Sequence, residues 1–156
     1  MIDVSHLTFT YEGNAKETLH DLSFSVKAKE IFGFLGPSGA GKSTTQKILF
    51  GLLKDYQGHV RIMDREIKDW DSQIYEQIGI SFELPNHYTS LTALENLDYF
   101  QSLFSGDCYE PRQVLEWVGL GDAADVRVQN FSKGMKIRLN VARSILHNPR
   151  ILFLDE

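Results

Sequence analysis

Apolar and polar residues alternate along two segments near the N-terminus, residues 2–11 and 19–26. A period of two is typical of strands with one buried face, and the residues between the segments are turn-forming types. We therefore expect an antiparallel pair of strands. Residues 31–35 are instead almost continuously apolar, as expected for a strand buried on both faces, and they lead directly into a glycine-rich loop.

The following segments mix helix and strand patterns. Residues 44–54 show a helical spacing of apolar residues, and Gly58 predicts a turn before a short strand at residues 60–63. Residues 72–77 are expected to form a short helix, and residues 78–83 another buried strand. The expected buried face of the first helix consists of Ile48, Leu49, Leu52 and Leu53.

The pattern becomes helical between residues 91 and 120, which indicates an inserted helical subdomain. Ser132 is a suitable N-cap for a long helix that reaches Leu146, because a serine hydroxyl can accept a hydrogen bond from the first turn. Residues 151–154 are then expected to form a buried strand. The expected inner face of the long helix consists of Ile137, Val141, Ala142 and Ile145.

Length and composition narrow the class of protein. At 156 residues the chain is the size of one compact domain or part of one, and its net charge of −5 is spread without long runs. That balance of charge argues against a nucleic-acid partner.

The N-terminus lacks a signal-peptide pattern, and no apolar stretch approaches the ~20 residues needed to span a bilayer, so a membrane role is expected only through a partner. Cys108 is the only cysteine, which suits a reducing cytosol.

The strongest chemical signal is the segment GPSGAGKS at residues 36–43, between the predicted buried strand and the predicted helix. It fits the phosphate-binding loop pattern, in which glycines let backbone N–H groups converge on phosphate oxygens at a helix N-terminus. Lys42 is expected to reach the terminal phosphates, and Ser43 to supply a hydroxyl ligand to Mg²⁺. The predicted nucleotide-binding residues of this loop are Gly36, Pro37, Ser38, Gly39, Ala40, Gly41, Lys42, Ser43 and Thr44.

Two acidic residues, Asp155 and Glu156, follow the last predicted strand. A phosphate-binding loop needs a second source of carboxylates, and the end of a neighbouring buried strand is a natural place for it. Asp155 is expected to bind Mg²⁺, through water, and Glu156 to act as the general base that polarises the attacking water. Taken alone, the two residues could equally be solvated acids at a strand end.

The segment FSKGMKIRLNVARSILHNP at residues 131–149 resembles the signature region of ATP-binding cassette (ABC) ATPases. In that family the motif reads Leu-Ser-Gly-Gly-Gln and precedes a basic helix that leads to the Mg²⁺ carboxylates. Here Ser132 and Gly134 match the motif, whereas Lys133 and Met135 replace its first glycine and its glutamine. The resemblance extends over residues 2–156, in the family's order of motifs.

The resemblance implies the fold and its division. We expect an α/β fold, with a P-loop NTPase core, an N-terminal antiparallel β subdomain, an inserted helical subdomain, and C-terminal strands missing. Residues 1–156 would form a partial ABC ATPase domain, ending directly after the catalytic carboxylates. Residues 1–84 and 147–156 would form the nucleotide-binding core, and residues 85–146 the helical subdomain with the signature helix.

The resemblance also implies roles for further residues. Tyr11 stands where the family stacks an aromatic ring on adenine, and Ser132 with Gly134 would bind the γ-phosphate of ATP held by an opposite cassette. Glu83 occupies the position of a glutamine that ligates Mg²⁺ in the family, so catalysis is expected to be retuned here. Simpler interpretations are a strand aromatic for Tyr11, a helix cap for Ser132 and a solvated acid for Glu83.

The function implied is that of an ATP-binding and ATP-hydrolysing subunit of an ABC transporter, with ATP and Mg²⁺ as cofactors. Its partners would be a second cassette, identical or different, and transmembrane subunits contacted through residues 84–104. We expect a cytoplasmic protein, peripheral at the inner face of the cell membrane and not inserted in it, and the altered signature favours export. Residues 1–156 alone are expected to hydrolyse ATP slowly or not at all.

Two other functions stay open. The chain could be a cassette that binds ATP but hydrolyses it poorly, or a truncated fragment, that acts as a regulatory or pairing module beside a better partner. Glu83 and Lys133 favour this, while Glu156 and the intact Lys42–Ser43 pair oppose it. It could also be another P-loop enzyme, such as a kinase or GTPase, against which the signature-like helix argues.

Overall fold

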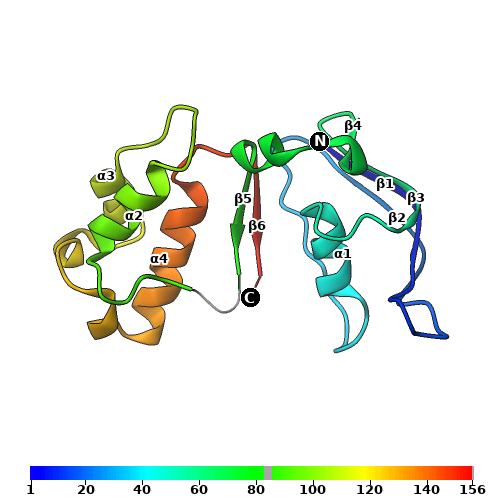
Figure 1. Cartoon of the computed structure of the whole chain (residues 1–156), viewed down its shortest axis with the longest axis horizontal. Coiled ribbons are helices and arrows are strands. Elements are labelled where there is room, and N and C mark those ends of the chain that lie inside the picture. The colour runs from blue at the N-terminus through cyan, green and yellow to red at the C-terminus, as the bar shows by residue number, and fades with distance from the viewer. Residues whose placement is uncertain (83–85, 156) are drawn as a thin grey trace. The chain divides into compact units, whose positions relative to one another are not determined.

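The computed structural model describes residues 1–82 and 86–155, which form two compact units, Met1–Asp71 and Ser72–Glu156. Each unit is described by itself, and Figure 1 labels their helices and strands. The two predicted site residues Glu83 and Glu156 lie outside the described residues.

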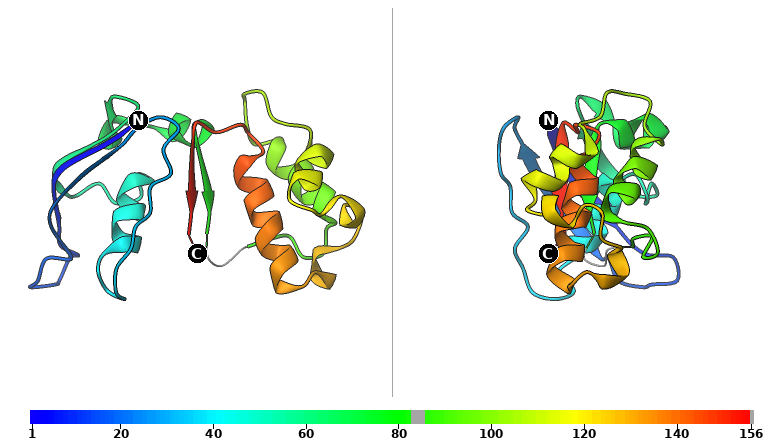
Figure 2. Two further views of the ribbon diagram at one scale, coloured as in Figure 1. Left: turned by 180° about the vertical axis from the view of Figure 1, so that it is seen from behind. Right: turned by 90° about the vertical axis from the view of Figure 1, so that its left-hand side faces the viewer.

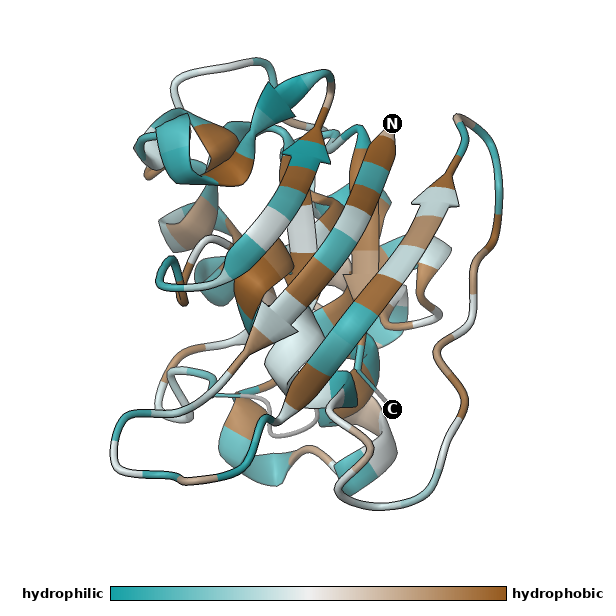
Figure 3. Cartoon of the chain, turned by 90° about the vertical axis from the view of Figure 1, so that its right-hand side faces the viewer, coloured by the Kyte–Doolittle hydropathy of each residue, from teal (hydrophilic) through white to brown (hydrophobic). Residues whose placement is uncertain are grey.

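The first unit is built on a four-stranded antiparallel sheet with the strand order β2-β1-β3-β4. Figure 3 shows the apolar and polar positions alternating along its strands, as expected for a sheet with one buried face. Leu7, Val60 and Ile62 are fully buried on that face. The predicted antiparallel pair near the N-terminus is therefore confirmed. The strands are β1 (Ile2–Phe9), β2 (Leu19–Val26), β3 (Gln57–Ile62) and β4 (Arg65–Glu66).

Helix α1 (Lys42–Leu49) follows the glycine-rich loop and is shorter than predicted. Ile48 and Leu49 are buried as expected, but Leu52 is 57% exposed. The helix ends because Gly51 has a φ of 72°, a left-handed conformation that cannot continue a right-handed helix. Apolar spacing alone does not reveal such a stop.

The prediction of a buried strand at residues 31–35 is wrong for this structure. The segment has no regular secondary structure, and Ile31 and Leu35 are almost fully exposed. Phe32 and Phe34 pack instead against Phe24 of β2, with ring centroids 5.3 and 5.0 Å from it. A strand needs a neighbour for its backbone hydrogen bonds, and this segment pairs with no strand among the described residues, so aromatic contacts hold it in place.

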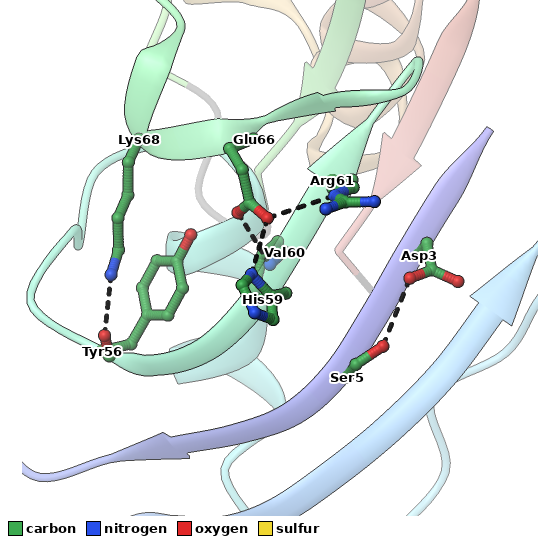
Figure 4. A network of polar contacts seen from close by, with 8 residues as sticks. All are labelled: Asp3, Ser5, Tyr56, His59, Val60, Arg61, Glu66 and Lys68. Atoms are coloured by element: carbon green, nitrogen blue, oxygen red, sulfur yellow. Dashed lines mark hydrogen bonds and ion pairs between the residues drawn. The ribbon is translucent and has the colours of Figure 1, made fainter.

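A polar network fixes the hairpin of β3 and β4, as Figure 4 shows. The Glu66 carboxylate accepts hydrogen bonds from the Val60 backbone N–H and from the Arg61 side chain, and it pairs with His59. Burial by itself would raise the pKa of Glu66, but these bonds lower it below its usual range. Nearby, the Lys68 ammonium donates to the backbone carbonyl of Tyr56 at 2.8 Å. The network stabilises the edge of the sheet away from the glycine-rich loop. The 3₁₀ turn η1 (Ile67–Asp69) follows it.

The second unit combines a parallel strand pair with helices, seen from two sides in Figures 1 and 2. Strands β5 (Ile78–Ser81) and β6 (Ile151–Leu154) lie side by side, and α4 (Lys133–Ile145) packs on β5. The predicted short helix before β5 is a 3₁₀ turn, η2 (Ser72–Glu76). The remaining elements are α2 (Ala93–Gln101), α3 (Pro111–Trp117), η3 (Gly121–Ala123) and η4 (Val128–Asn130).

Helices α2, α3 and α4 bury a common core, so the predicted helical segment is confirmed. The buried apolar residues of α4 are Leu139 and Ala142, together with Leu146 at its C-cap, whereas Ile137 of the predicted face is 38% exposed. The shift arises because α4 also packs against β5 and buries the polar residues Asn140 and Ser144. Of the predicted inner face, Ala142 is among the fully buried residues, and the pattern gave no sign of the buried polar residues.

Helix α4 approaches β5 very closely at one point. A Cβ atom on Gly79 would overlap the backbone carbonyl of Ser144 and come within 2.9 Å of the Pro149 ring, so a side chain at this position would push the helix away. The prediction that β6 is buried holds only in part, because Leu152 is 40% and Leu154 is 58% exposed. Full burial needs cover on both faces of the pair, and in the described unit α4 is the helix that packs on β5 and β6.

Candidate nucleotide-binding site

The glycine-rich loop leads into the N-terminus of α1, as the sequence predicts. The Ala40 N–H donates to the Pro37 carbonyl at 3.2 Å, which forms a turn, and Lys42 is the first residue of the helix. Residues 36–40 are exposed, and Ser43 is exposed at the start of the helix. The first N–H groups of a helix have no intrahelical acceptor, so this end of α1 offers donors and a partial positive charge to an anion.

Gly41 is the residue at which the loop turns into the helix. It has a φ of 88°, a conformation that favours glycine, and a Cβ atom here would overlap the Leu19 side chain of β2. Its carbonyl accepts hydrogen bonds from the Thr45 backbone N–H at 2.8 Å and the Thr45 hydroxyl at 3.0 Å. Strand β2 therefore sets the path of the loop, and only glycine fits at this turn.

Lys42 extends back over the loop. Its Nζ donates to the carbonyl oxygens of Gly36 at 2.9 Å and Pro37 at 3.1 Å. Both acceptors are neutral, so phosphate oxygens carrying full negative charge would compete favourably for the same ammonium. The lysine is held where an anion bound by the loop would meet it.

Tyr11 lies beside the loop in the same unit. Its hydroxyl is 3.3 Å from the hydroxyl of Thr44, which is buried on α1, and its ring packs edge-on against Phe9 with centroids 4.8 Å apart. The structure thus brings Tyr11 and the phosphate-binding loop together. Adenine stacking on the half-buried ring remains a prediction.

Replacement of Tyr11 by alanine is expected to weaken ATP binding about fivefold, because aromatic stacking contributes about 1 kcal/mol beyond area burial. Tyr11→Phe keeps the ring and loses only the contact with Thr44, so its affinity should stay near that of the unmodified protein. Equilibrium binding of a ribose-labelled fluorescent ATP analogue measures both variants. Equal losses in both would show that the hydroxyl, and not the ring, carries the effect.

The carboxylate Asp155 continues the parallel strand pair of the second unit. Its backbone N–H donates to the Ser81 carbonyl at 2.9 Å, which places it directly after β6 and opposite the end of β5. The side chain of Asp155 is half-buried. Metal binding by Asp155 and the base role of Glu156 stay predictions.

The signature residues lie at the N-terminus of the 13-residue helix α4. Ser132 is its N-cap, and its hydroxyl oxygen accepts a hydrogen bond from the Met135 N–H at 3.2 Å. The hydroxyl hydrogen remains able to donate to a phosphate oxygen. Gly134 is exposed, and a Cβ atom there would meet only the Ser132 hydroxyl, at 4.0 Å, which leaves open space above this helix end. The cap interpretation of Ser132 is confirmed, and it is compatible with the predicted phosphate contact.

Sequence reasoning missed a cavity of about 580 Å³ in the second unit, lined partly by Phe82, Asn86, Tyr88 and Arg143. Two histidines also line it. Its walls come from segments far apart in the sequence, so no local pattern could have indicated it.

His147 and His87 are held in one tautomer on the walls of this cavity. The Nε2 of His147 lies 3.0 Å from the Ile78 carbonyl, and that of His87 lies 2.9 Å from the Lys136 carbonyl. A carbonyl only accepts, so Nε2–H donates in each ring and Nδ1 is left buried without a partner in the described structure. Burial lowers the pKa of both, although the carbonyl bonds oppose this.

The stability of the protein is expected to fall on acidification from pH 7.5 to pH 5, and His147 should contribute to the loss. Its folded-state pKa is below the unfolded value of 6.5, so the unfolded state binds more protons once the pH falls below about 6.5. His147→Gln cannot titrate and should show a smaller loss between the two pH values. Urea unfolding midpoints measure this. His20→Gln, at a histidine that is 83% exposed, is the control, and an equal change in both variants would contradict the assignment.

A glycine-rich loop that opens a helix, with a lysine held over it, defines a P-loop nucleotide-binding protein. Residues 19–156 match the family model described as ABC transporter, and the chain belongs to this family as part of an ATP-binding domain. It is 51% identical over 156 residues to the fluoroquinolones export ATP-binding protein of Mycobacterium tuberculosis (strain H37Rv), covering 100% of this chain and 52% of that protein.

Other relatives and solved structures agree. The bacitracin transport ATP-binding protein of Bacillus licheniformis is 40% identical over 157 residues, covering 100% of this chain and 51% of that protein. A dimeric ATP-binding cassette in a post-hydrolysis state, bound to ADP and Pi, superposes with a TM-score of 0.84 at 27% identity, covering 100% of this chain and 74% of that one. The chain thus spans about half the length of these curated relatives and has the fold of an ABC cassette. Within residues 1–82 and 86–155, no helix is long and apolar enough to cross a bilayer.

Proposed function

We propose that the protein is the ATP-hydrolysing subunit of an ABC transporter and powers export of a substrate across a membrane. The observation that carries this is the loop at Gly36–Ser43, because it leads into the N-terminus of α1 and Lys42 is held over it by hydrogen bonds to the Gly36 and Pro37 carbonyls. The relative whose name states export of fluoroquinolones supports the export direction, and the relative whose name states bacitracin transport supports a role in transport. The protein would act at the inner face of the cell membrane.

The donor set fits Mg²⁺-ATP. The Ser43 hydroxyl, the Asp155 carboxylate and Glu83 are oxygen ligands of the kind that Mg²⁺ prefers. Bound Mg²⁺ would neutralise charge on the terminal phosphates. Lys42 binds the same phosphates, Tyr11 holds the adenine, and Glu156 takes the proton of the attacking water. In this proposal the nucleotide-binding core comprises residues 1–84 and 147–156, and the helical subdomain with the signature helix comprises residues 85–146.

A second cassette completes each site in this proposal. The open space above Gly134 and the free hydrogen of the Ser132 hydroxyl, both at the N-terminus of α4, suit the γ-phosphate of ATP bound to a partner. The dimeric form of the similar cassette bound to ADP and Pi supports this arrangement. ATP binding would close the pair and hydrolysis would reopen it.

The transmembrane subunits would dock on the cavity in the second unit. Phe82 and Tyr88 on its walls are 44% and 47% exposed, and Tyr99 next to Tyr88 is 44% exposed. Exposed aromatic side chains around a hollow are typical of interaction surfaces. Residues 86–104 therefore supply a surface through which α2 and α4 could pass motion to a membrane partner.

The proposal is tested by phosphate release from the full-length protein with and without Mg²⁺, alone and together with its transmembrane partner. We expect Mg²⁺-dependent hydrolysis of ATP. The second candidate, a cassette that binds ATP but hydrolyses it poorly, is favoured by the sequence departures at Glu83 and Lys133. Tight ATP binding without turnover, even with the membrane partner present, would decide for that candidate.

A further inference from the structure

Thr45 of α1 lies one helical turn beyond the glycine-rich loop and outside the set of predicted nucleotide-binding residues. The residue is 1% exposed. Its hydroxyl donates to the Gly41 carbonyl at 3.0 Å, and its backbone N–H donates to the same oxygen at 2.8 Å. A carbonyl oxygen has two lone pairs, so the two bonds fill its capacity to accept. Thr45 therefore holds the Gly41 carbonyl through two donors.

These bonds set the direction of the peptide unit that joins Gly41 to Lys42. In a planar trans peptide the carbonyl and the N–H point in opposite directions. Because the Gly41 carbonyl points along α1 to Thr45, the Lys42 N–H points out of the helix N-terminus, toward the side on which such a loop binds an anion. The bonds to the carbonyl also polarise the peptide, which makes the Lys42 N–H a stronger donor.

A glycine at the N-cap makes this orientation hard to keep without such bonds. Gly41 has no side chain that could cap α1, so the first N–H groups of the helix stay available to a ligand. The missing side chain also lets the peptide rotate more freely than at any other residue type. Leu19 of β2 closes off the space beside Gly41, and Thr45 holds its carbonyl. A donor that is fixed in advance binds its ligand without the entropy loss of ordering the loop.

We propose that Thr45 is a positioning residue, whose hydroxyl directs the Lys42 N–H at the phosphates of the nucleotide and strengthens this donor. The inference rests on the proposed function, in which the loop binds ATP. A threonine hydroxyl bonded to the carbonyl four residues earlier also occurs inside helices, where it serves no ligand. The bond of Thr45 differs because its acceptor is the N-cap carbonyl, so the N–H of the same peptide lies at the open end of the helix.

Variants of the full-length protein test the inference. Thr45→Val keeps the shape of the side chain and loses the hydroxyl, whereas Thr45→Ser keeps the hydroxyl. Thr8→Val is the matched control, because it makes the same substitution on β1, where the hydroxyl accepts a hydrogen bond from the Asp21 N–H at 3.1 Å. The thermal midpoint of Thr45→Val without nucleotide should fall by less than about 4 °C, since the Thr45 N–H still satisfies the Gly41 carbonyl. Thr45→Ala, which also lacks the hydroxyl, replaces Thr45→Val if that variant does not fold.

The expected loss is confined to the phosphates. Thr45→Val should weaken ATP binding about fivefold, the factor that corresponds to one neutral hydrogen bond. Inorganic tripolyphosphate, which has the phosphates without the base, should lose the same factor when it competes with a fluorescent ATP analogue. Thr45→Ser and Thr8→Val should bind both ligands within about twofold of the unmodified protein.

The amide resonance of Lys42, in protein made with ¹⁵N-labelled lysine, supplies a second readout. A stronger hydrogen bond moves an amide proton downfield, so saturating ATP should shift this proton less in Thr45→Val than in Thr45→Ser or the unmodified protein. Unchanged affinity for both ligands, or an equal shift at saturation, overturns the inference and leaves the proposed function intact. A loss of affinity for ATP but not for tripolyphosphate also overturns it. An unmodified protein that binds neither ligand overturns the inference and the proposed function together.

Discussion

Replacement of Lys42 by alanine is expected to weaken ATP binding about 100-fold, because a charge-assisted hydrogen bond to phosphate is worth about 2–3 kcal/mol. The lysine side chain donates hydrogen bonds to two carbonyls of an exposed loop. The free energy of unfolding should therefore fall by less than about 1 kcal/mol. A large effect on ATP affinity with a small effect on the free energy of unfolding is expected for a lysine whose main role is to bind the ligand.

Binding of a fluorescent ATP analogue with Mg²⁺ measures the first effect, and thermal unfolding of samples without added nucleotide measures the second. Lys47→Ala is the matched control, since Lys47 is also on α1 but is exposed in its last turn. Its affinity should remain that of the unmodified protein. Equal ATP affinity of Lys42→Ala and Lys47→Ala would mean that the glycine-rich segment is an ordinary turn that does not bind the nucleotide.

Glu156→Gln is expected to lower the rate of ATP hydrolysis at least about 100-fold while ATP still binds, because the amide cannot accept the proton of the attacking water. If ATP closes two cassettes on each other, this variant should also accumulate as a dimer in the presence of ATP and Mg²⁺. The prediction rests on the sequence and the proposed function, as Glu156 is outside the described residues.

Phosphate release and light scattering on the full-length protein measure the two effects separately. Glu116→Gln, at an exposed carboxylate on α3, is the control for the loss of one charge. A Glu156→Gln variant that turns over ATP within about threefold of the unmodified protein would assign the base role to another group. Slow turnover without an ATP-dependent dimer would support Glu156 as the general base but contradict the closure of two cassettes on each other.

Local patterns predicted the elements whose structure depends on neighbours in the sequence. The β1–β2 pair, the cap at Ser132 and the helix after the glycine-rich loop all follow from periodicity, turn chemistry and capping, which act over a few residues. The loop from Gly36 to Ser43 was recognisable for the same reason, because its chemistry is contained in eight consecutive residues.

The errors concern features that distant contacts decide. Residues 31–35 have the composition of a buried strand, yet no strand pairs with them in the described structure, and their phenylalanines pack on Phe24 instead. The inner face of α4 was misplaced because Asn140 and Ser144 are polar and nevertheless buried. A polar residue indicates exposure unless its hydrogen-bond partners are known, and two partners of Asn140, Ser81 and Phe82, are 59 and 58 residues away in the sequence.

The same limit applies to the site. Lys42 and Asp155 could be proposed from motifs, but Arg143 could be placed beside Asn86 on the wall of the cavity only after folding brought α4 next to that segment. The cavity walls likewise join β5, α2 and α4, so their common surface has no signature in any one segment.

The close approach of Gly79 to Ser144 gives α4 the geometry of a lever. With a rise of 1.5 Å per residue, Ser132 is about 18 Å along the helix from this fulcrum, whereas Asn140 is about 6 Å from it. A rigid tilt of about 6° about this point would therefore move Ser132 by about 2 Å but Asn140 by only about 0.6 Å. A displacement at the N-terminus of α4 would be reduced about threefold in amplitude at the end of β5, and the force would be correspondingly larger.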